Sequence, residues 1–386
     1  MSPERVEIVD SIAAVDRDEW NRLATPAGFY SSYEWLATVE PENQGHCRYV
    51  EVWQGDRLAA ALPVYLVTAQ SNTSYRPATH FDKAPAAATV CLAGSHRGYR
   101  NTVLLDPELT GSARAGALAA VADALGRTCA GAGYAYFLFL TSAGVATLRE
   151  LGGCLPPVPT YAAEATLAAV GEGFDDYLGS LTATRRKTVR KEIRRFGRAG
   201  LTVSVEPVWE QRDLLVRLVG NLNRKHGRAF AERDHRAALD RQQEHLAGSA
   251  VMFVCRAGLL PVGLTMGFVW GGWLYLWYAG FDYDRMPGGY EYFNVTIYEP
   301  LRYCYEHGLS GVHLGAGTQH AKGVRGATVA PLFASAWPVS EVDELASTGL
   351  RERVAEHWRA QISLAPRAFP VERWGDIVPG RQKEAV

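Results

Sequence analysis

The feature that most constrains the fold is a pair of apolar segments joined by a short turn, which occurs twice in the chain. Residues 49–67 read YVEVWQGDRLAAALPVYLV, and residues 251–269 read VMFVCRAGLLPVGLTMGFV. Both hold strand-forming residues, a turn, and a second strand with a proline near its start, which is typical of a β-hairpin. The later hairpin continues through WGGW into a third strand that ends near residue 282. The repetition predicts two lobes built on one plan.

Helical spacing and buried strands surround these hairpins. Apolar residues at i, i+4, i+8 and i+11 from Phe293 predict a helix over 289–308, which Pro300 should kink or split. Further helices are expected at 16–24, 31–40 and 111–133, and further strands at 134–140 and 310–317.

The order of these elements predicts the fold class. Strands, helix and strand in both halves indicate an α+β or mixed α/β fold: two tandem lobes, each a mixed, mainly antiparallel sheet flanked by helices. The lobes are expected to span residues 1–165 and 166–345, with 346–386 as a packing tail.

Composition excludes some classes of protein. The 386 residues are 47% apolar and 21% charged with a formal net charge of −1, which suits a soluble globular protein better than a general nucleic-acid binder. No run approaches the roughly 18 apolar residues of a membrane helix, and the N-terminus lacks the pattern of a secretion signal, so we expect a cytoplasmic protein. The cysteines are scattered, which predicts buried thiols, and no metal-ligand spacing is present, so no metal is expected.

Residues 173–200, GFDDYLGSLTATRRKTVRKEIRRFGRAG, hold the most one-sided charge of the chain. Val189, Ile193 and Phe196 lie at i, i+4 and i+7, which predicts an amphipathic helix with a narrow apolar stripe. Glu192 is its one acid between 185 and 198, for a net charge of +7. The helix is either a solvated surface or a site for an anionic partner: RNA, the phosphates of coenzyme A or, with less support, a membrane. Its cations are Arg185, Arg186, Lys187, Arg190, Lys191, Arg194, Arg195 and Arg198.

The order of motifs after this helix resembles a known family. Residues 278–326, YAGFDYDRMPGGYEYFNVTIYEPLRYCYEHGLSGVHLGAGTQHAKGVRG, give an aromatic helix ending in glycine, a strand, and a Lys-x-x-Arg-Gly loop. This order is similar to that of the GNAT-superfamily branch that includes the Fem-type peptidoglycan aminoacyltransferases and related natural-product acyltransferases. The resemblance, clearest over 173–335, implies two GNAT-like lobes around a cleft, with the acceptor on the first lobe and the donor on the second. It also implies transfer of an acyl group to an amine.

Two donors occur in that branch, aminoacyl-tRNA and acyl-CoA. A CoA-binding member normally has a Gln/Arg-x-x-Gly-x-Gly/Ala loop whose amides hold the pyrophosphate at a helix start. The nearest match, RMPGGY, has Tyr290 where a small residue belongs. This incomplete match weakens the case for acyl-CoA as the donor. The basic helix favours an RNA donor, bound through its phosphates. The expected donor-binding residues are Arg325, Arg185, Arg186, Arg190, Lys191, Arg194, Arg285, Gly288 and Gly289.

The glycine-rich segment LGAGTQHAKGVRG supplies candidate catalytic groups. Aminolysis of an ester or thioester needs a neutral amine and a stabilised oxyanion, and it can proceed by direct transfer. Lys322 is assigned to stabilisation of the oxyanion or a donor phosphate, and Arg325, three residues on, to binding phosphate or carboxylate at the same anionic group. His320 is assigned to proton transfer. The alternative is a glycine turn with solvated charges.

Carboxylates and loop residues complete the predicted site. The carboxylate of Asp282 or Glu291 can accept a proton from the acceptor's ammonium group or simply bind that group. Glu291 also suits the first turn of a helix. The acceptor is expected on the polar, aromatic loops of residues 68–103, which are otherwise ordinary surface loops. The expected acceptor-binding residues are Tyr75, Arg76, His80, Asp82, Tyr99, Asn101 and Tyr290.

The sequence therefore leads to an acyltransferase that forms an amide from aminoacyl-tRNA and an amine of a small metabolite or peptidoglycan-type precursor. Neither donor is a resident cofactor, so no cofactor is expected. An acyl-CoA-dependent N-acyltransferase and a catalytically silent RNA- or ligand-binding relative remain the alternatives.

Overall fold

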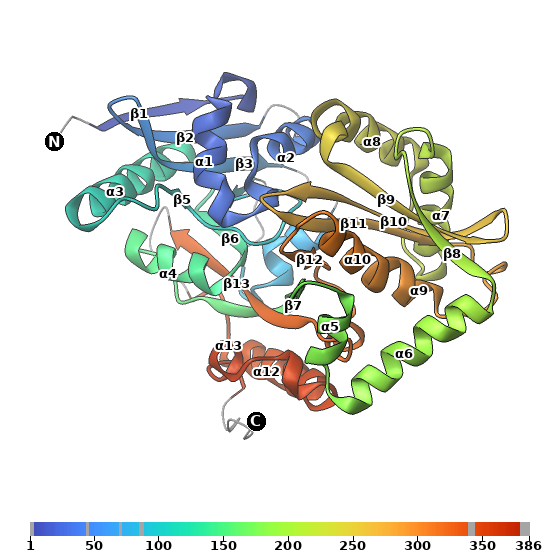
Figure 1. Cartoon of the computed structure of the whole chain (residues 1–386). Helices are drawn as coiled ribbons and strands as arrows, with labels where there is room; N and C mark the ends of the chain where they lie inside the picture. Colours follow the sequence, from blue (N-terminus) through green and yellow to red (C-terminus); the bar gives the residue numbers. More distant parts are fainter. Residues whose placement is uncertain (1–3, 44–45, 69–71, 85–88, 339–343, 379–386) are drawn as a thin grey trace. The chain divides into compact units, whose positions relative to one another are not determined.

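The chain divides into two units, each described here by itself. The computed structural model describes residues 4–43, 46–68, 72–84, 89–338 and 344–378 (Figure 1). Unit 1 comprises Met1–Ala163, Ala330–Gln361 and Val371–Val386, and unit 2 comprises Glu164–Val329 and Ile362–Pro370. The first division lies within two residues of the expected boundary at 165. The structure corrects the C-terminal boundary, because residues 330–345 belong to unit 1 and both units share the tail.

The sheet of unit 1 is mixed and mainly antiparallel. Its strands lie in the order β1-β2-β3-β4-β6-β13, followed by the start of β7, and β5 pairs with β3. The β4–β6 pair is parallel, whereas β1–β2, β2–β3, β3–β4 and β6–β13 are antiparallel. The strands are β1 (Glu4–Val9), β2 (Cys47–Gln54), β3 (Arg57–Val67), β4 (Val90–Ala93), β5 (Leu104–Leu105), β6 (Tyr134–Leu140), β7 (Val158–Ala168) and β13 (Thr328–Pro338).

Helices bury both faces of this sheet. Val50 and Val52 pack into one apolar core with Val121 of α3, while Tyr49, on the other face, meets Trp20 of α1 edge-on at 5.7 Å between ring centroids. Because neighbouring residues of a strand point to opposite faces, covering both faces favours strands that are apolar almost throughout, as β6 (YAYFLFL) is. The helices of this part are α1 (Arg17–Ala27), α2 (Tyr33–Val39), α3 (Gly111–Thr128), α4 (Ser142–Leu151), α12 (Thr348–Leu364) and α13 (Val371–Trp374).

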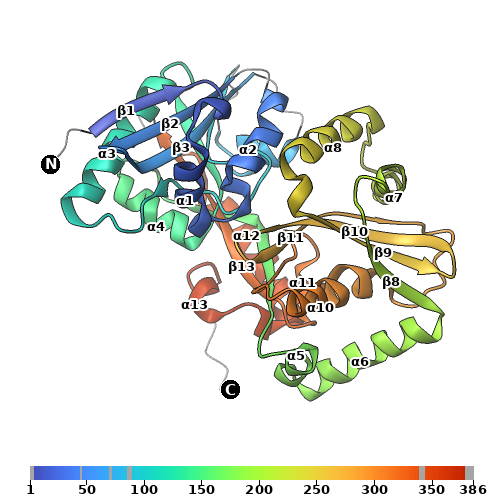
Figure 2. The same ribbon diagram turned by 45° about the horizontal axis from the view of Figure 1, so that its top comes forward.

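Unit 2 repeats the plan with the order β7-β12-β11-β10-β9-β8. Only the β11–β12 pair among those described here is parallel. Figure 2 shows α7 and α8 on one side of β8–β11 and α6 and α10 on the other. Gly280 lets α7 approach β11, since a side chain there would lie 2.4 Å from the Leu218 backbone. The strands are β8 (Leu201–Glu206), β9 (Ala250–Ala257), β10 (Leu260–Trp270), β11 (Trp273–Phe281) and β12 (Gly311–His313).

The helices of unit 2 include the two segments on which the sequence analysis placed most weight. The basic segment forms two helices, α5 (Phe174–Ser180) and α6 (Ala183–Arg198). The predicted helix over 289–308 is split as expected: a π-helical turn (Asn294–Tyr298) separates α9 (Glu291–Phe293) from α10 (Glu299–Glu306), which has Pro300 in its first turn. The others are α7 (Arg212–Lys225), α8 (Glu232–Leu246), α11 (Gln319–Gly323) and a 3₁₀ turn (Pro366–Ala368).

The structure confirms the predicted hairpins and the third strand after WGGW, and it corrects two other expectations. Strand β4 lies within the segment predicted as loops, and β1, β5, β7, β8 and β13 were not predicted. Cys91 and Cys129 form a disulfide with their Cα atoms 6.0 Å apart, whereas six thiols were expected. The remaining four cysteines are free.

Candidate active site

The site begins where two parallel strands of unit 2 stop pairing. β11 and β12 pair only over Trp273–Tyr275 and Gly311–His313. Beyond these residues, β11 continues to Phe281 and the other strand turns into the glycine-rich segment. Gly315 takes a φ of 74° there, which a glycine adopts without the steric cost of a side chain. The turn leads directly into α11, which carries Lys322.

Lys322 is a buried amine held by backbone carbonyls. Its Nζ donates to the carbonyl oxygens of Leu314 at 2.5 Å and Gly315 at 3.4 Å. Burial lowers the pKa of Lys322 to about 7, because the charged form loses its hydration. An ammonium group has three N–H donors, so the third remains for another acceptor. His320 lies half-buried two residues earlier, and positions two apart on a helix do not face each other.

The tail of the chain supports α11. A side-chain Cβ at Gly323 would lie 2.6 Å from the Cβ of Ala368 and 3.5 Å from that of Ala365. The close approach of these segments therefore requires glycine at 323. Residues 362–370, predicted only as packing, fix the short helix that carries Lys322.

A buried acid–imidazole pair lies next to this turn and was not predicted. His313 Nε2 lies 3.2 Å from Glu164 Oε2, and their side chains are only 1% and 6% exposed. Tyr275 stacks on the His313 ring at 5.2 Å between centroids. Because Leu314 directly follows His313, the same strand end positions this pair and the carbonyl that accepts from Lys322. Glu164 and His313 lie on strands far apart in sequence, so no local spacing predicts that they meet. The local sign of a functional role was an acid or an imidazole inside a strand.

Arg325 is committed to an internal ion pair, which corrects the expectation that it meets an anion together with Lys322. Its Nη2 and Nε donate to the two carboxylate oxygens of Glu192 at 2.6 and 3.0 Å. Tyr298 contributes its hydroxyl to the same group, donating to Glu192 and accepting from Arg325 Nε at 3.1 Å. The guanidinium also lies 3.1 Å from the Phe293 ring centroid. Glu192 therefore faces inward and does not offset the cations on the exposed surface of α6.

The turn before α9 binds its own anion. Glu291 is buried, and its Oε1 accepts from the amides of Gly288 at 2.8 Å and Gly289 at 3.0 Å. These are the amides that the sequence assigned to a donor pyrophosphate, and Glu291 was expected either at the acceptor's ammonium group or as an acid of the first helical turn. Glu291 lies in the first turn of α9 and accepts from both amides, which corrects their assignment to a pyrophosphate and agrees with the second expectation for Glu291. Tyr290 takes a left-handed conformation between them, with a φ of 67°.

The remaining candidates of unit 2 differ in burial. Asp282 is buried and accepts from Arg217 at 3.3 Å, so it is paired rather than free. Arg285 is exposed. Arg186 donates to the carbonyls of Gly179 at 3.3 Å and Leu181 at 3.0 Å, which fixes the corner between α5 and α6. Burial, and secondly Arg367, lower the pKa of Arg185. Arg190, Lys191 and Arg194 are exposed on α6.

The predicted acceptor residues of unit 1 mainly hold its loops together. The Tyr75 hydroxyl donates to the Gly98 carbonyl at 2.7 Å, and the His80 ring lies 2.8 Å from the Ser74 carbonyl. Burial raises the pKa of Tyr75 and Tyr99 and lowers that of His80. Tyr75, His80 and Tyr99 all surround Phe139. Acceptor binding at these positions stays a prediction, and these contacts show that the same groups hold the loops together.

The other loop candidates behave in the same way. Asn101 is buried, accepting from the Ser95 amide at 2.8 Å and donating to the Leu138 carbonyl at 2.6 Å. Asp82 accepts from the Ser347 amide at 2.9 Å and anchors the start of α12, and these bonds lower its pKa. Arg76 is exposed.

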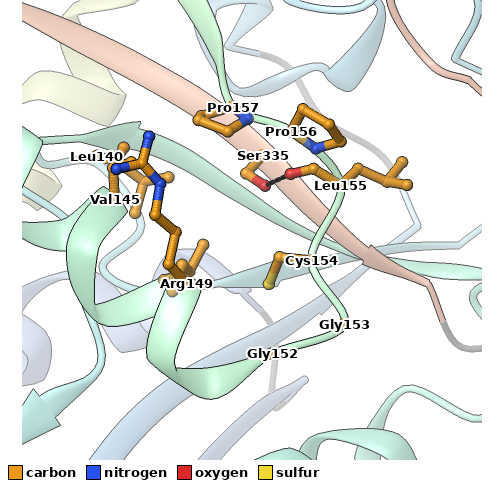
Figure 3. A pocket seen from close by; sticks show the side chains of 11 residues that line it. Leu140, Val145, Arg149, Gly152, Gly153, Cys154, Leu155, Pro156, Pro157 and Ser335 are labelled. Carbon is orange, nitrogen blue, oxygen red and sulfur yellow. Dashed lines mark hydrogen bonds between the residues drawn. The ribbon is translucent and has the colours of Figure 1, made fainter.

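Unit 1 has a hollow of about 380 Å³ that the sequence analysis did not predict (Figure 3). Val145 and Leu148 of α4 and Leu155 form apolar walls, and Arg149 is the one charged residue of the lining. The Ser335 hydroxyl donates to the Leu155 carbonyl at 2.7 Å. None of the predicted acceptor residues lines this hollow.

Comparison with known proteins identifies the class. Residues 183–323, from α6 to α11, match the acetyltransferase (GNAT) domain family, so this part of the chain is a GNAT-related acyltransferase domain. Its fold is that of FemX, with 13% identity and a TM-score of 0.57 over 90% of this chain and 99% of that one. The C-terminal domain of a putative lysylphosphatidylglycerol synthetase from Agrobacterium fabrum is also similar, with 11% identity and a TM-score of 0.51 over 92% and 98%.

A protein of unknown function from Bacteroides thetaiotaomicron shares this fold too, at 13% identity and a TM-score of 0.52 over 86% of this chain and 100% of that one. The search of curated proteins found no match to this sequence. These findings confirm the Fem-like resemblance and the predicted fold class. Among the described residues, no helix has the length and apolar character to cross a membrane, and no cluster of ligands for a metal ion is present.

Proposed function

We propose that the protein transfers an aminoacyl group from aminoacyl-tRNA to an amine of a small metabolite or peptidoglycan-type precursor. The observation that carries this proposal is the exposed surface of α6. Its cations form no ion pair with a carboxylate in the described part of the chain, and its single acid, Glu192, is turned inward to Arg325. A helix whose exposed face carries one sign of charge suits a polyanion, and RNA offers a phosphate at every nucleotide.

The turn before α9 supports RNA over coenzyme A as the donor. A CoA pyrophosphate would need the amides of Gly288 and Gly289, and Glu291 already accepts from both. Displacing the carboxylate would leave a buried charge without partners, which is costly.

The chemistry proposed for the site is direct aminolysis. The acceptor nitrogen attacks the ester carbonyl, a C–N bond forms, and the bond to the ribose oxygen breaks. The third N–H of Lys322 stabilises the oxyanion, because the other two are directed to the Leu314 and Gly315 carbonyls. His320 is the proposed carrier of the proton that leaves the attacking amine and returns to the ribose oxygen.

The test is RNA binding and transfer with a charge-reversed helix. Lys187, Lys191 and Arg198 are exposed on α6, so K187E/K191E/R198E should fold normally. Arg228, Arg233 and Arg359 are exposed elsewhere, and R228E/R233E/R359E provides a control with the same change in total charge. We expect aminoacyl-tRNA binding to weaken steeply with salt in the wild type and by at least ~100-fold in the α6 variant, with little change in the control.

Three other outcomes contradict the proposal. Equal loss in both variants would mean that total charge, and not α6, attracts RNA. Binding of acetyl-CoA by all three proteins without binding of tRNA would favour the acyl-CoA-dependent N-acyltransferase. Binding of tRNA without transfer to any amine would favour the catalytically silent relative.

A further inference from the structure

A charged hollow of about 340 Å³ lies between α5, α6 and α10 of unit 2. It is apart from Lys322 and its carbonyl partners, none of which lines it. Its lining combines three arginines, one acid, an aromatic ring and aliphatic side chains: Gly173, Phe174, Asp175, Leu178, Arg190, Ile193, Arg194 and Arg302.

Two of the arginines are placed to hold one anion. Arg190 and Arg194 are four residues apart on α6, which puts them on the same side of the helix. Both are exposed, and neither forms an ion pair in the described part of the chain. Asp175 is the one acid of the lining, so the hollow has a net charge of +2. This balance suits a single phosphate, with Asp175 available to accept a hydrogen bond from a hydroxyl or amino group.

The third arginine lies over an aromatic ring. The Arg302 guanidinium carbon lies 3.7 Å from the centroid of the Phe174 ring, and its Nε is 3.4 Å from Glu299. The Phe174 ring also contacts the rings of Tyr177 at 5.1 Å and Tyr298 at 6.4 Å between centroids. A guanidinium group over an aromatic ring is also a group on which a nucleobase stacks. Leu178 and Ile193 supply apolar contacts beside it.

We propose that this hollow binds one nucleotide, with its phosphate at Arg190 and Arg194 and its base stacked on the Arg302–Phe174 pair. The volume is near the lower end of the about 300–1,000 Å³ of small-molecule pockets, which suits one nucleotide and excludes a duplex. The nucleotide is either free or an unpaired residue of an RNA strand. Only the RNA source rests on the proposed function, because a free nucleotide binds irrespective of the donor used in transfer.

The first experiment measures binding of AMP and of inorganic phosphate by calorimetry to the wild type, R194Q, F174L and R302Q. R194Q should weaken the binding of AMP by about tenfold, as expected for loss of one charged contact to phosphate. F174L and R302Q should weaken AMP binding by about tenfold or more, since each variant removes part of the group on which the base stacks. K187Q removes a cation of α6 that does not line the hollow and should leave AMP binding unchanged.

The outcomes separate the two proposals. AMP binding that is no tighter than phosphate binding, or that is equal in the wild type and R302Q, overturns the nucleotide site. R194Q, on an exposed position, keeps the test valid if F174L fails to fold. A single-stranded pentaribonucleotide distinguishes the sources: it should compete with AMP if the hollow accepts an RNA residue. Loss of tRNA binding in K187E/K191E/R198E with unchanged AMP binding would support both sites separately, whereas AMP binding without any tRNA binding would contradict only the proposed function.

Discussion

Removing both partners of the buried Glu192–Arg325 pair should cost much less free energy of unfolding than the sum of the costs of removing each partner alone. The side chains are only 4% and 7% exposed. In R325M, the Glu192 carboxylate keeps only the Tyr298 hydroxyl described here, and in E192M the guanidinium keeps Tyr298 and the Ala321 carbonyl. Deleting one partner of a buried pair costs about 3–5 kcal/mol. We expect a loss of about 4 kcal/mol for R325M and about 3 kcal/mol for E192M, where more partners remain.

The double variant leaves no buried charge. It still loses the bonds of Tyr298 and leaves the Ala321 carbonyl without its donor, so we expect E192M/R325M to lose about 4 kcal/mol. The difference between the double variant and the sum of the single variants is then about 3 kcal/mol, near the upper end of coupling energies measured for neighbouring residues.

Urea unfolding of the four proteins, followed by tryptophan fluorescence and far-UV circular dichroism, measures this coupling. The exposed Arg236–Glu232 pair on α8 provides a control cycle, for which about 0.3–0.5 kcal/mol is expected. If the Glu192 and Arg325 effects add to within about 0.5 kcal/mol, the reasoning is refuted, and Arg325 would be free to bind a donor.

Four further results are expected. Transfer activity should fall as pH rises through about 7, because Lys322 then loses the proton that it offers the oxyanion. K322M should be nearly inactive at every pH. A transfer rate that rises through pH 7 would instead make Lys322 a base. Burial, and secondly Glu7, raise the pKa of Glu51 to about 7. The contribution of Glu51 to the free energy of unfolding is therefore present at low pH and lost as pH rises through 7. Urea unfolding should find E51Q more stable than the wild type by about 2 kcal/mol at pH 8 and equal to it at pH 4. Titration of thiols in guanidinium chloride should find four before reduction and six after it, whereas six at once would exclude the Cys91–Cys129 disulfide. G323A should cost about 1–3 kcal/mol through its approach to Ala368, and G317A, at a position with open space, serves as its control in thermal unfolding.

The elements that the sequence predicts well are those whose causes are local. Both hairpins follow from alternating strand residues and the turns between them, and the split of the helix at Pro300 follows from the proline itself. Strand β4 was missed because its four apolar residues lie among polar loop residues, and its place is fixed by pairing with β3 and β6.

The candidate site was predictable only in part. Lys322 was identified from the motif that carries it, but its burial depends on contacts made by the turn and by the tail. The partner of Arg325 is 133 residues away in sequence, and no local pattern marks Glu192 as a buried acid rather than a surface one. Glu291 differs, because its partners are two and three residues before it, so an acid two residues after paired glycines can be recognised as a cap of its own turn.

The interleaving of the two units has a consequence for synthesis of the protein on the ribosome. Strand β6 ends at Leu140, and its neighbour β13 supplies Phe333 as the pairing partner of that residue. At about 5–20 residues per second, the intervening chain takes roughly 10–40 s to emerge. During that time the edge of YAYFLFL stays open while nearly all of unit 2 is completed. An open apolar strand edge is a template for pairing between chains. A lower growth temperature or an added chaperone should therefore raise the yield of folded protein more than any change to the surface of unit 2.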